Sequence, residues 1–234
     1  MEEQKKRGPP LVTYLFLATA ALIMVYVSLL PPSGVERFYR AYAFSASSIF
    51  ELSSTNVLEN VGLLGLFTYM FLHASWMHFL MNAVALLGAG IIVEKEIGST
   101  RYALVYLFSG VSAAITYSLL HMSSADTLVG ASGAIFGVIA VLFLLMPFKI
   151  TFTLVIPLPS VLVGLMLSIV EFSALLQAQI QTGVAHEAHL AGFLFGGIFA
   201  FAIDRRRAMK GLIIAVIIFL ILFYLGIQFR LLQP

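Results

Sequence analysis

The stretch Gly130–Gly137, which reads GASGAIFG, opens an apolar run that continues to about Met146. A serine among small residues just inside a membrane span is common, because small residues let transmembrane helices approach closely and serine hydroxyls bond to nearby carbonyls. From this stretch alone, helix packing is the simpler interpretation of Ser132. Two other apolar runs bring histidines and an asparagine to the same depth, and they change that interpretation.

The composition is that of a polytopic membrane protein. Of the 234 residues, 61% are hydrophobic and only 10% are charged, far from a soluble globular mixture. Runs of about 20 apolar residues can each cross a bilayer as a helix. The chain has no cysteine, which excludes disulfides, thiolate metal sites and a cysteine nucleophile. The sequence therefore predicts an all-α bundle of about seven transmembrane helices.

The predicted spans are separated by loops and turns, some of them basic or proline-containing and others only polar. They run approximately over Leu11–Leu30, Leu72–Val93, Tyr102–Leu120, Gly130–Met146, Ser160–Leu176, Ala185–Ile203 and Leu212–Ile227. We interpret residues 1–234 as one membrane domain, with a six-span core over 11–204 and a basic turn plus an additional C-terminal span over 205–234. The first run lacks a small-residue cleavage site and is expected to remain as a span. The net charge of +2 comes from loop Lys and Arg, and it gives no reason to expect nucleic-acid binding.

The loop of roughly forty residues after the first span is unusually aromatic. Its aromatic residues are Phe38, Tyr39, Tyr42, Phe44 and Phe50. Such a mixture with arginines suggests a structured element lying in the membrane interface. An ordinary folded outer loop is the alternative.

Basic residues predict the orientation. If seven spans alternate, ten of the thirteen Lys and Arg fall on one side, and only Arg37, Arg40 and Arg230 fall on the other. The positive-inside rule then places the N-terminus in the cytosol and the C-terminus outside. The short termini suggest a prokaryotic cytoplasmic membrane.

The second, fourth and sixth spans then enter the membrane from the outer side. Their first turns carry polar residues: His78 and Asn82, Ser132, and His189. At about 1.5 Å of rise per residue, these positions fall within roughly 10 Å of one depth. Because the orientation is assigned from Lys and Arg alone, this convergence is an independent observation.

Glycine patterns predict that the fourth and sixth spans pack closely. Gly133–Gly137 and Gly192–Gly196 each carry a glycine at both ends, which lets helix backbones come close. Such packing would bring Ser132 toward hydrogen-bond reach of His189. A serine hydroxyl is a poor nucleophile unless a positioned base takes its proton, and neutral imidazole is the usual base. The pattern predicts a Ser-His dyad, because no carboxylate obviously orients His189.

The second span supplies candidate oxyanion donors. His78 and Asn82 are four residues apart and share one helix face. Polar side chains in membrane helices tend to point into the bundle. If these two face Ser132, they can donate to an oxyanion together with the Ser132 backbone N–H. His73 lies on another face near the loop, and we interpret its ring as a structural hydrogen-bonding group rather than a catalytic one.

The sequence resembles the rhomboid intramembrane serine proteases over roughly residues 65–204. Three family motifs are present in the right order: His-x4-His-x3-Asn at His73, His78 and Asn82; Gly-x-Ser-Gly with a following aromatic at Gly130, Ser132, Gly133 and Phe136; and Ala-His-x-x-Gly-x-x-x-Gly at Ala188, His189, Gly192 and Gly196. The serine motif alone would be weak, whereas the three together are highly specific.

The resemblance implies hydrolysis of a peptide bond in or near a substrate's transmembrane segment. Ser132 would attack, and His189 would act as base and then as acid. His78, Asn82 and the Ser132 backbone amide would stabilise the oxyanion, and Phe136 would stack on His189. No cofactor or metal is implied, and the expected partners are transmembrane protein substrates and the lipid bilayer.

Two residues stand out from this pattern. Position 186, often aromatic in relatives, is His186. Glu171 is an acid inside the apolar fifth span, where charges are rare. We interpret it as a protonated or hydrogen-bonded acid within the bundle, with a role in gating as the alternative.

Three other functions compete with a serine protease. His186–His189 resembles a zinc metalloprotease signature, but that signature places its histidines four apart; here the spacing is three, and no third ligand motif stands out. A rhomboid-like pseudoprotease would bind membrane clients without cutting them, yet such proteins usually lack one of the residues found here at Ser132 and His189. A transporter is disfavoured because intramembrane charge is scarce and no inverted repeat appears.

Overall fold

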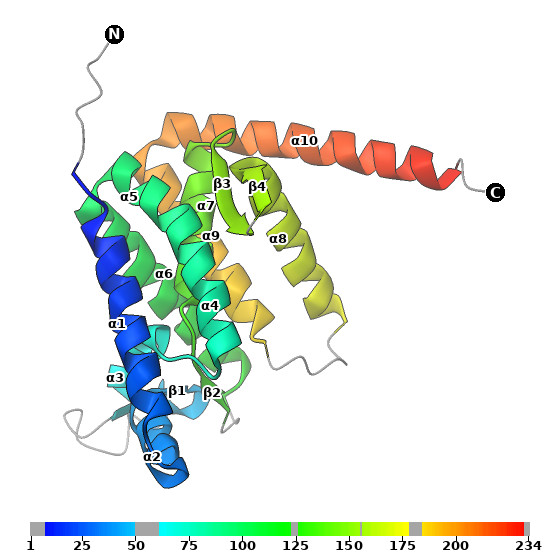
Figure 1. Cartoon of the computed structure of the whole chain (residues 1–234). Helices are drawn as coiled ribbons and strands as arrows, with labels where there is room; N and C mark the ends of the chain where they lie inside the picture. Colours follow the sequence, from blue (N-terminus) through cyan, green and yellow to red (C-terminus); the bar gives the residue numbers. More distant parts are fainter. Residues whose placement is uncertain (1–7, 50–60, 123–125, 155, 178–183, 232–234) are drawn as a thin grey trace.

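The computed structural model describes residues 8–49, 61–122, 126–154, 156–177 and 184–231. It is a helical bundle, as the composition predicts (Figure 1). Its main helices are α1 (Leu11–Ser28), α4 (Trp76–Ala85), η5 (Leu86–Gly90), α5 (Ile91–Ile97), α6 (Ser99–Leu120), α7 (Ser132–Leu145), α8 (Ser160–Leu176), α9 (His186–Ile203) and α10 (Arg205–Leu231). Five segments are long and apolar enough to span a membrane, and α7 and α8 are shorter apolar helices. The chain is therefore a multi-pass integral membrane protein. The basic tail at 1–7, Phe50 and most of the turn before α9 lie outside the described residues.

Helix α7 forms the centre of the bundle. Its residues from Gly133 to Leu145 are all buried, and it packs mainly against α6 and α9. At about 1.5 Å per residue, a helix of this length extends about 21 Å, less than the roughly 30 Å hydrocarbon core of a bilayer. Ser132, the first residue of α7, is therefore recessed from one membrane surface when Leu145 reaches the other.

The predicted close approach of the fourth and sixth spans is confirmed. A Cβ atom added to Gly192 would lie 2.8 Å from the carbonyl carbon of Gly133. A Cβ atom on Gly196 would lie 2.6 Å from the carbonyl carbon of Gly137. Backbone atoms never tolerate a Cβ at such distances, so glycine is required for α7 and α9 to pack this closely.

The described residues of the first loop, 31–49 and 61–71, are folded into short elements. The smaller elements of the chain are α2 (Pro32–Tyr42), β1 (Phe44–Ser45), η1 (Ala46–Ile49), α3 (Val61–Thr68), η4 (Tyr69–Phe71), β2 (Thr127–Leu128), β3 (Ile150–Leu154) and β4 (Ile156–Pro159). Phe38 of α2 packs on Tyr26 of α1 with ring centroids 5.6 Å apart, and Phe44 pairs with Leu128 in the antiparallel β1–β2 ladder. Both α3 and η4 lie within the segment that the sequence predicts as the loop between the first two spans.

Two features at the other end of the bundle have no clear sequence signal. The second span contains a π-helical turn, η5, and the hairpin β3–β4 lies beside it (Figure 1). The Thr151 hydroxyl donates to the Gly88 carbonyl over 2.9 Å. A π turn interrupts the regular i→i−4 hydrogen bonds of an α-helix, and this side chain gives the Gly88 carbonyl a donor. A Cβ atom on Gly88 would lie 2.6 Å from the Thr153 nitrogen, so a glycine lets the hairpin approach.

Helix α10 begins directly after α9 and crosses the end of the bundle (Figure 1). Ala208 and Ala215 on its first half are buried, and Gly211 packs against the backbone of Leu144 in α7. Its second half is exposed and apolar, from Phe219 to Ile227. The additional C-terminal helix is thus present, and it runs across the bundle end rather than alongside its neighbours.

Candidate active site

Ser132 and His189 lie in hydrogen-bond contact. The Ser132 Oγ atom is 2.7 Å from the Nε2 atom of His189. Ser132 begins α7 and His189 lies in the first turn of α9, so the glycine contacts between these helices set their separation. The Phe136 ring stacks on the imidazole, with centroids 4.5 Å apart and planes 10° from parallel. The ring of His189 is therefore held with one nitrogen directed at the serine hydroxyl.

Gly130 shapes the backbone before Ser132. Its φ of +119° is a conformation that side-chain-bearing residues rarely adopt, and its N–H donates to the Tyr69 carbonyl over 2.9 Å. A Cβ atom here would lie 2.7 Å from the Nε2 atom of His78 and 3.8 Å from Ser132 Oγ. The His78 ring and the serine hydroxyl therefore flank the same small space, which a larger residue at position 130 would fill.

The start of α7 provides a further polar group at this space. Helix N-termini leave their first N–H groups without intrahelical acceptors and carry a partial positive charge. The Ser132 N–H is among these groups because Ser132 is the first helical residue. An oxygen bearing negative charge would be stabilised there.

Asn82 is less directly placed than His78. It is buried, and its Nδ2 atom donates to the His78 carbonyl one turn earlier over 2.9 Å. Within the described part of the chain its amide makes no hydrogen bond to Ser132. The structure thus brings His78 beside the serine and leaves Asn82 bonded to its own helix.

His73 lies in the connection before α4, which begins later than predicted because Ser75 caps it by accepting from the His78 N–H. The Tyr39 hydroxyl donates to the His73 carbonyl over 2.6 Å, and burial raises the pKa of Tyr39. The His73 ring packs edge-on against His78, with centroids 5.1 Å apart. Both ring nitrogens of His73 are buried, and the structural hydrogen-bonding role expected of this ring stays a prediction.

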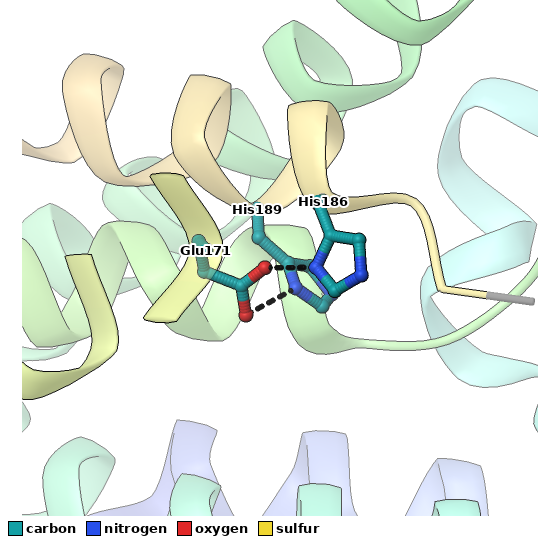
Figure 2. A group of neighbouring side chains, drawn as sticks. All are labelled: Glu171, His186 and His189. Atoms are coloured by element: carbon teal, nitrogen blue, oxygen red, sulfur yellow. Dashed lines mark hydrogen bonds and ion pairs between the residues drawn. The ribbon is translucent and has the colours of Figure 1, made fainter. Parts of the chain in front are cut away.

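Glu171 and His186 join the site, which the sequence did not predict (Figure 2). One carboxylate oxygen of Glu171 lies 3.0 Å from the Nδ1 atom of His189, and the other lies 2.5 Å from the Nδ1 atom of His186. The expectation that no carboxylate orients His189 is therefore wrong. The available signal was an acid in an apolar run, but nothing local indicates that α8 turns this residue toward the start of α9.

Glu171, His186 and His189 are also residue types that could bind a metal ion. Their ligand atoms lie within 4.8 Å of one another, so Glu171 is the third potential ligand absent from the local motif. Two ligand atoms on one tetrahedral zinc are separated by roughly 3.4 Å, given zinc–ligand distances of about 2.0–2.2 Å. The separations here, 2.5 and 3.0 Å, are hydrogen-bond lengths. The geometry therefore fits protons shared between these groups better than shared ligation.

Comparison with known proteins identifies relatives. The profile of the Rhomboid domain matches residues 61–206. RHOMBOID-like protein 1 of Arabidopsis thaliana is 32% identical over 150 residues, covering 56% of this chain and 38% of the relative. Rhomboid protease GluP of Bacillus subtilis (strain 168) is 30% identical over 148 residues, covering 60% of this chain and 27% of the relative. Rhomboid-like protease 5 of Toxoplasma gondii is 30% identical over 155 residues, covering 64% and 18%. The matched segment thus spans well under half the length of these relatives.

Proposed function

The chain belongs to the rhomboid family, and we propose that it is a serine endopeptidase that cleaves transmembrane segments of membrane proteins. The observation that carries the proposal is the 2.7 Å contact between Ser132 Oγ and His189 Nε2. A recessed serine beside an imidazole, in a bundle of apolar helices, is suited to attack on a peptide bond brought in from the bilayer. Protease-named relatives in two organisms support the same reaction.

The proposed reaction follows from the positions of the polar groups. His189 takes the hydroxyl proton as Ser132 Oγ attacks the substrate carbonyl carbon, and the imidazolium then gives that proton to the departing amine. Water next attacks the acyl-enzyme, with His189 again as base. The imidazolium then returns this proton to Ser132 Oγ as the bond from Oγ to the acyl carbon breaks, and the carboxylic acid product leaves. We assign the Ser132 N–H and the His78 ring as donors for the oxyanion, and Asn82 a supporting part through its bond to the His78 carbonyl.

We also propose that the site opens toward the outer side of a cytoplasmic membrane, with the N-terminus in the cytosol. The distribution of Lys and Arg supports this orientation. The short α7 supports a serine recessed by several ångströms, a depth that water can reach from one side. A substrate helix would have to unwind locally to present its peptide bond there.

Cleavage of a tethered transmembrane substrate in liposomes tests the proposal, with wild type beside Ser132→Ala and His189→Ala. We expect cleavage by wild type and a loss of at least about 10³-fold in each variant, because both groups act in the same step. A fluorophosphonate probe should label wild type at Ser132 only. Folded wild type that neither cleaves nor labels would instead indicate a client-binding pseudoprotease, the main alternative.

A further inference from the structure

The carboxylate of Glu171 is fully engaged by two imidazoles. Its side chain is 8% exposed, and each oxygen faces a different Nδ1 atom, one from His189 and one from His186. The carboxylate comes from α8 and both rings come from the first turn of α9 (Figure 2). An ionised carboxylate accepts from both rings, which leaves no oxygen without a partner. The carboxylate thus has the hydrogen-bond partners that a buried charge requires.

The contact at His189 Nδ1 bears directly on the other ring nitrogen. To accept a proton from Ser132, the neutral His189 ring must carry its hydrogen on Nδ1, so that Nε2 has a free lone pair. An acceptor at Nδ1 favours that tautomer and also stabilises the imidazolium formed during attack. Phe136 packs on the ring face while Glu171 bonds its edge, so the two contacts restrict different motions of the ring.

We propose that Glu171 is a positioning residue that completes a Ser132–His189–Glu171 triad, and that His186 fixes the Glu171 carboxylate through its other oxygen. This inference rests on the proposed serine protease function and specifies how its base is oriented. Two residues that stand out in the sequence, an acid inside an apolar span and a histidine at the start of the sixth span, are the two that meet here. The contact accounts for both features together.

A kinetic test uses Glu171→Gln, which keeps the size of the side chain but removes its charge. We expect kcat to fall by about 10²–10⁴-fold with KM nearly unchanged, because loss of the triad acid leaves binding intact but disfavours the productive tautomer. The acidic limb of the pH–rate profile should move to lower pH, since the imidazolium loses its anionic partner. A purely structural defect would lower the active fraction without moving that limb.

Three further variants define the effect. Glu171→Asp retains the charge, and its kcat should be at least about tenfold higher than that of Glu171→Gln. His186→Phe keeps a ring but frees one carboxylate oxygen, and should cost about tenfold. Glu187→Gln is the matched control: this acid lies in the same turn of α9 but pairs with His121 at 2.7 Å, so activity should stay within about twofold. Equal losses in Glu171→Gln and Glu187→Gln would overturn the proposal.

A second measurement does not depend on activity. Nitrogen NMR of histidine-labelled protein in micelles reports the His189 tautomer, assigned by loss of its signal in His189→Ala. We expect the Nδ1–H tautomer in wild type and a shift toward Nε2–H in Glu171→Gln. Unchanged tautomers would refute the positioning role even if wild type is an active protease. Conversely, a Glu171-dependent tautomer in protein that never reacts with fluorophosphonate would retain the positioning contact and refute the protease function.

Discussion

Glu94 illustrates how a single buried carboxylate can hold two distant segments of this bundle. One of its oxygens accepts from the Val12 N–H at 3.0 Å and the Ser99 hydroxyl at 2.6 Å. The other accepts from the Thr13 N–H at 2.8 Å and the Thr13 hydroxyl at 2.7 Å. Helix α1 has no side-chain cap at Pro10, so Glu94 satisfies its first N–H groups from the first turn of α5.

We therefore expect Glu94→Gln to lower the free energy of unfolding by roughly 2–4 kcal/mol. The glutamine amide is uncharged, and its nitrogen cannot accept the hydrogen bonds that one carboxylate oxygen of Glu94 accepts. Glu96→Gln is the matched control. Glu96 pairs with Arg207 on the surface, where an ion pair contributes at most about 1 kcal/mol. Thermal unfolding or steric trapping in bicelles measures the stability of both variants. A comparable loss of stability in Glu94→Gln and Glu96→Gln would contradict this role of Glu94.

At the scale of elements, the contact between α7 and α9 determines whether the candidate site can form. These helices carry Ser132 and His189 and touch through glycines, so any side chain between them pushes the two residues apart. The adjacent Gly196 and Gly197 differ sharply in this respect. A Cβ atom on Gly196 would meet the Gly137 backbone, whereas one on Gly197 would lie 3.7 Å from a Leu144 methyl group.

Alanine substitutions at Gly196 and Gly197 should therefore differ in their effects on stability and on labelling of Ser132. Gly196→Ala is expected to cost about 1–3 kcal/mol of stability and to reduce fluorophosphonate labelling of Ser132 at least tenfold, because the helices must move apart. Gly197→Ala makes an ordinary contact and replaces glycine with a better helix former, so stability and labelling should be unchanged or slightly raised. Normal labelling in the folded Gly196→Ala protein would show that the helix spacing does not control the site.

At the scale of the whole molecule, α10 is the element whose position depends most on the membrane. Its second half exposes large apolar side chains from Phe219 to Ile227, and such a surface belongs in lipid. Its length and mean hydropathy also suffice for a span. The helix can reach the bilayer core by turning at Asp204, where α9 ends.

The absence of cysteine makes a labelling test straightforward. With an impermeant maleimide on intact cells, Met122→Cys should react, because it follows α6 at the end that carries the candidate site. Met209→Cys in the first half of α10 should react only after permeabilisation. We expect Gln228→Cys to react from outside, as a seventh span requires. Reaction of Gln228→Cys only from inside would mean that α10 lies along the cytosolic face.

The order and approximate bounds of the spans were accessible from the sequence because they depend on local hydropathy, proline and basic residues. Span five, predicted over Ser160–Leu176, has those bounds in the structure. The convergence of Ser132 and His189 was also accessible, because helix rise and glycine spacing are properties of each span alone. The elements that were missed, such as η5 and β3–β4, owe their conformation to non-local contacts like that between Thr151 and Gly88.

The sequence by itself therefore determined a membrane bundle and the depth of its polar groups, since hydropathy, periodicity and rise per residue act along one helix. Only the tertiary structure decided that Glu171 meets His186 and His189. Their contact depends on how closely α8 packs on α9; an acid in an apolar span indicates that its side chain faces the bundle, but not which residues it meets there. The physical reason is that hydrogen bonds between helices act over about 3 Å and require both partners to be in place.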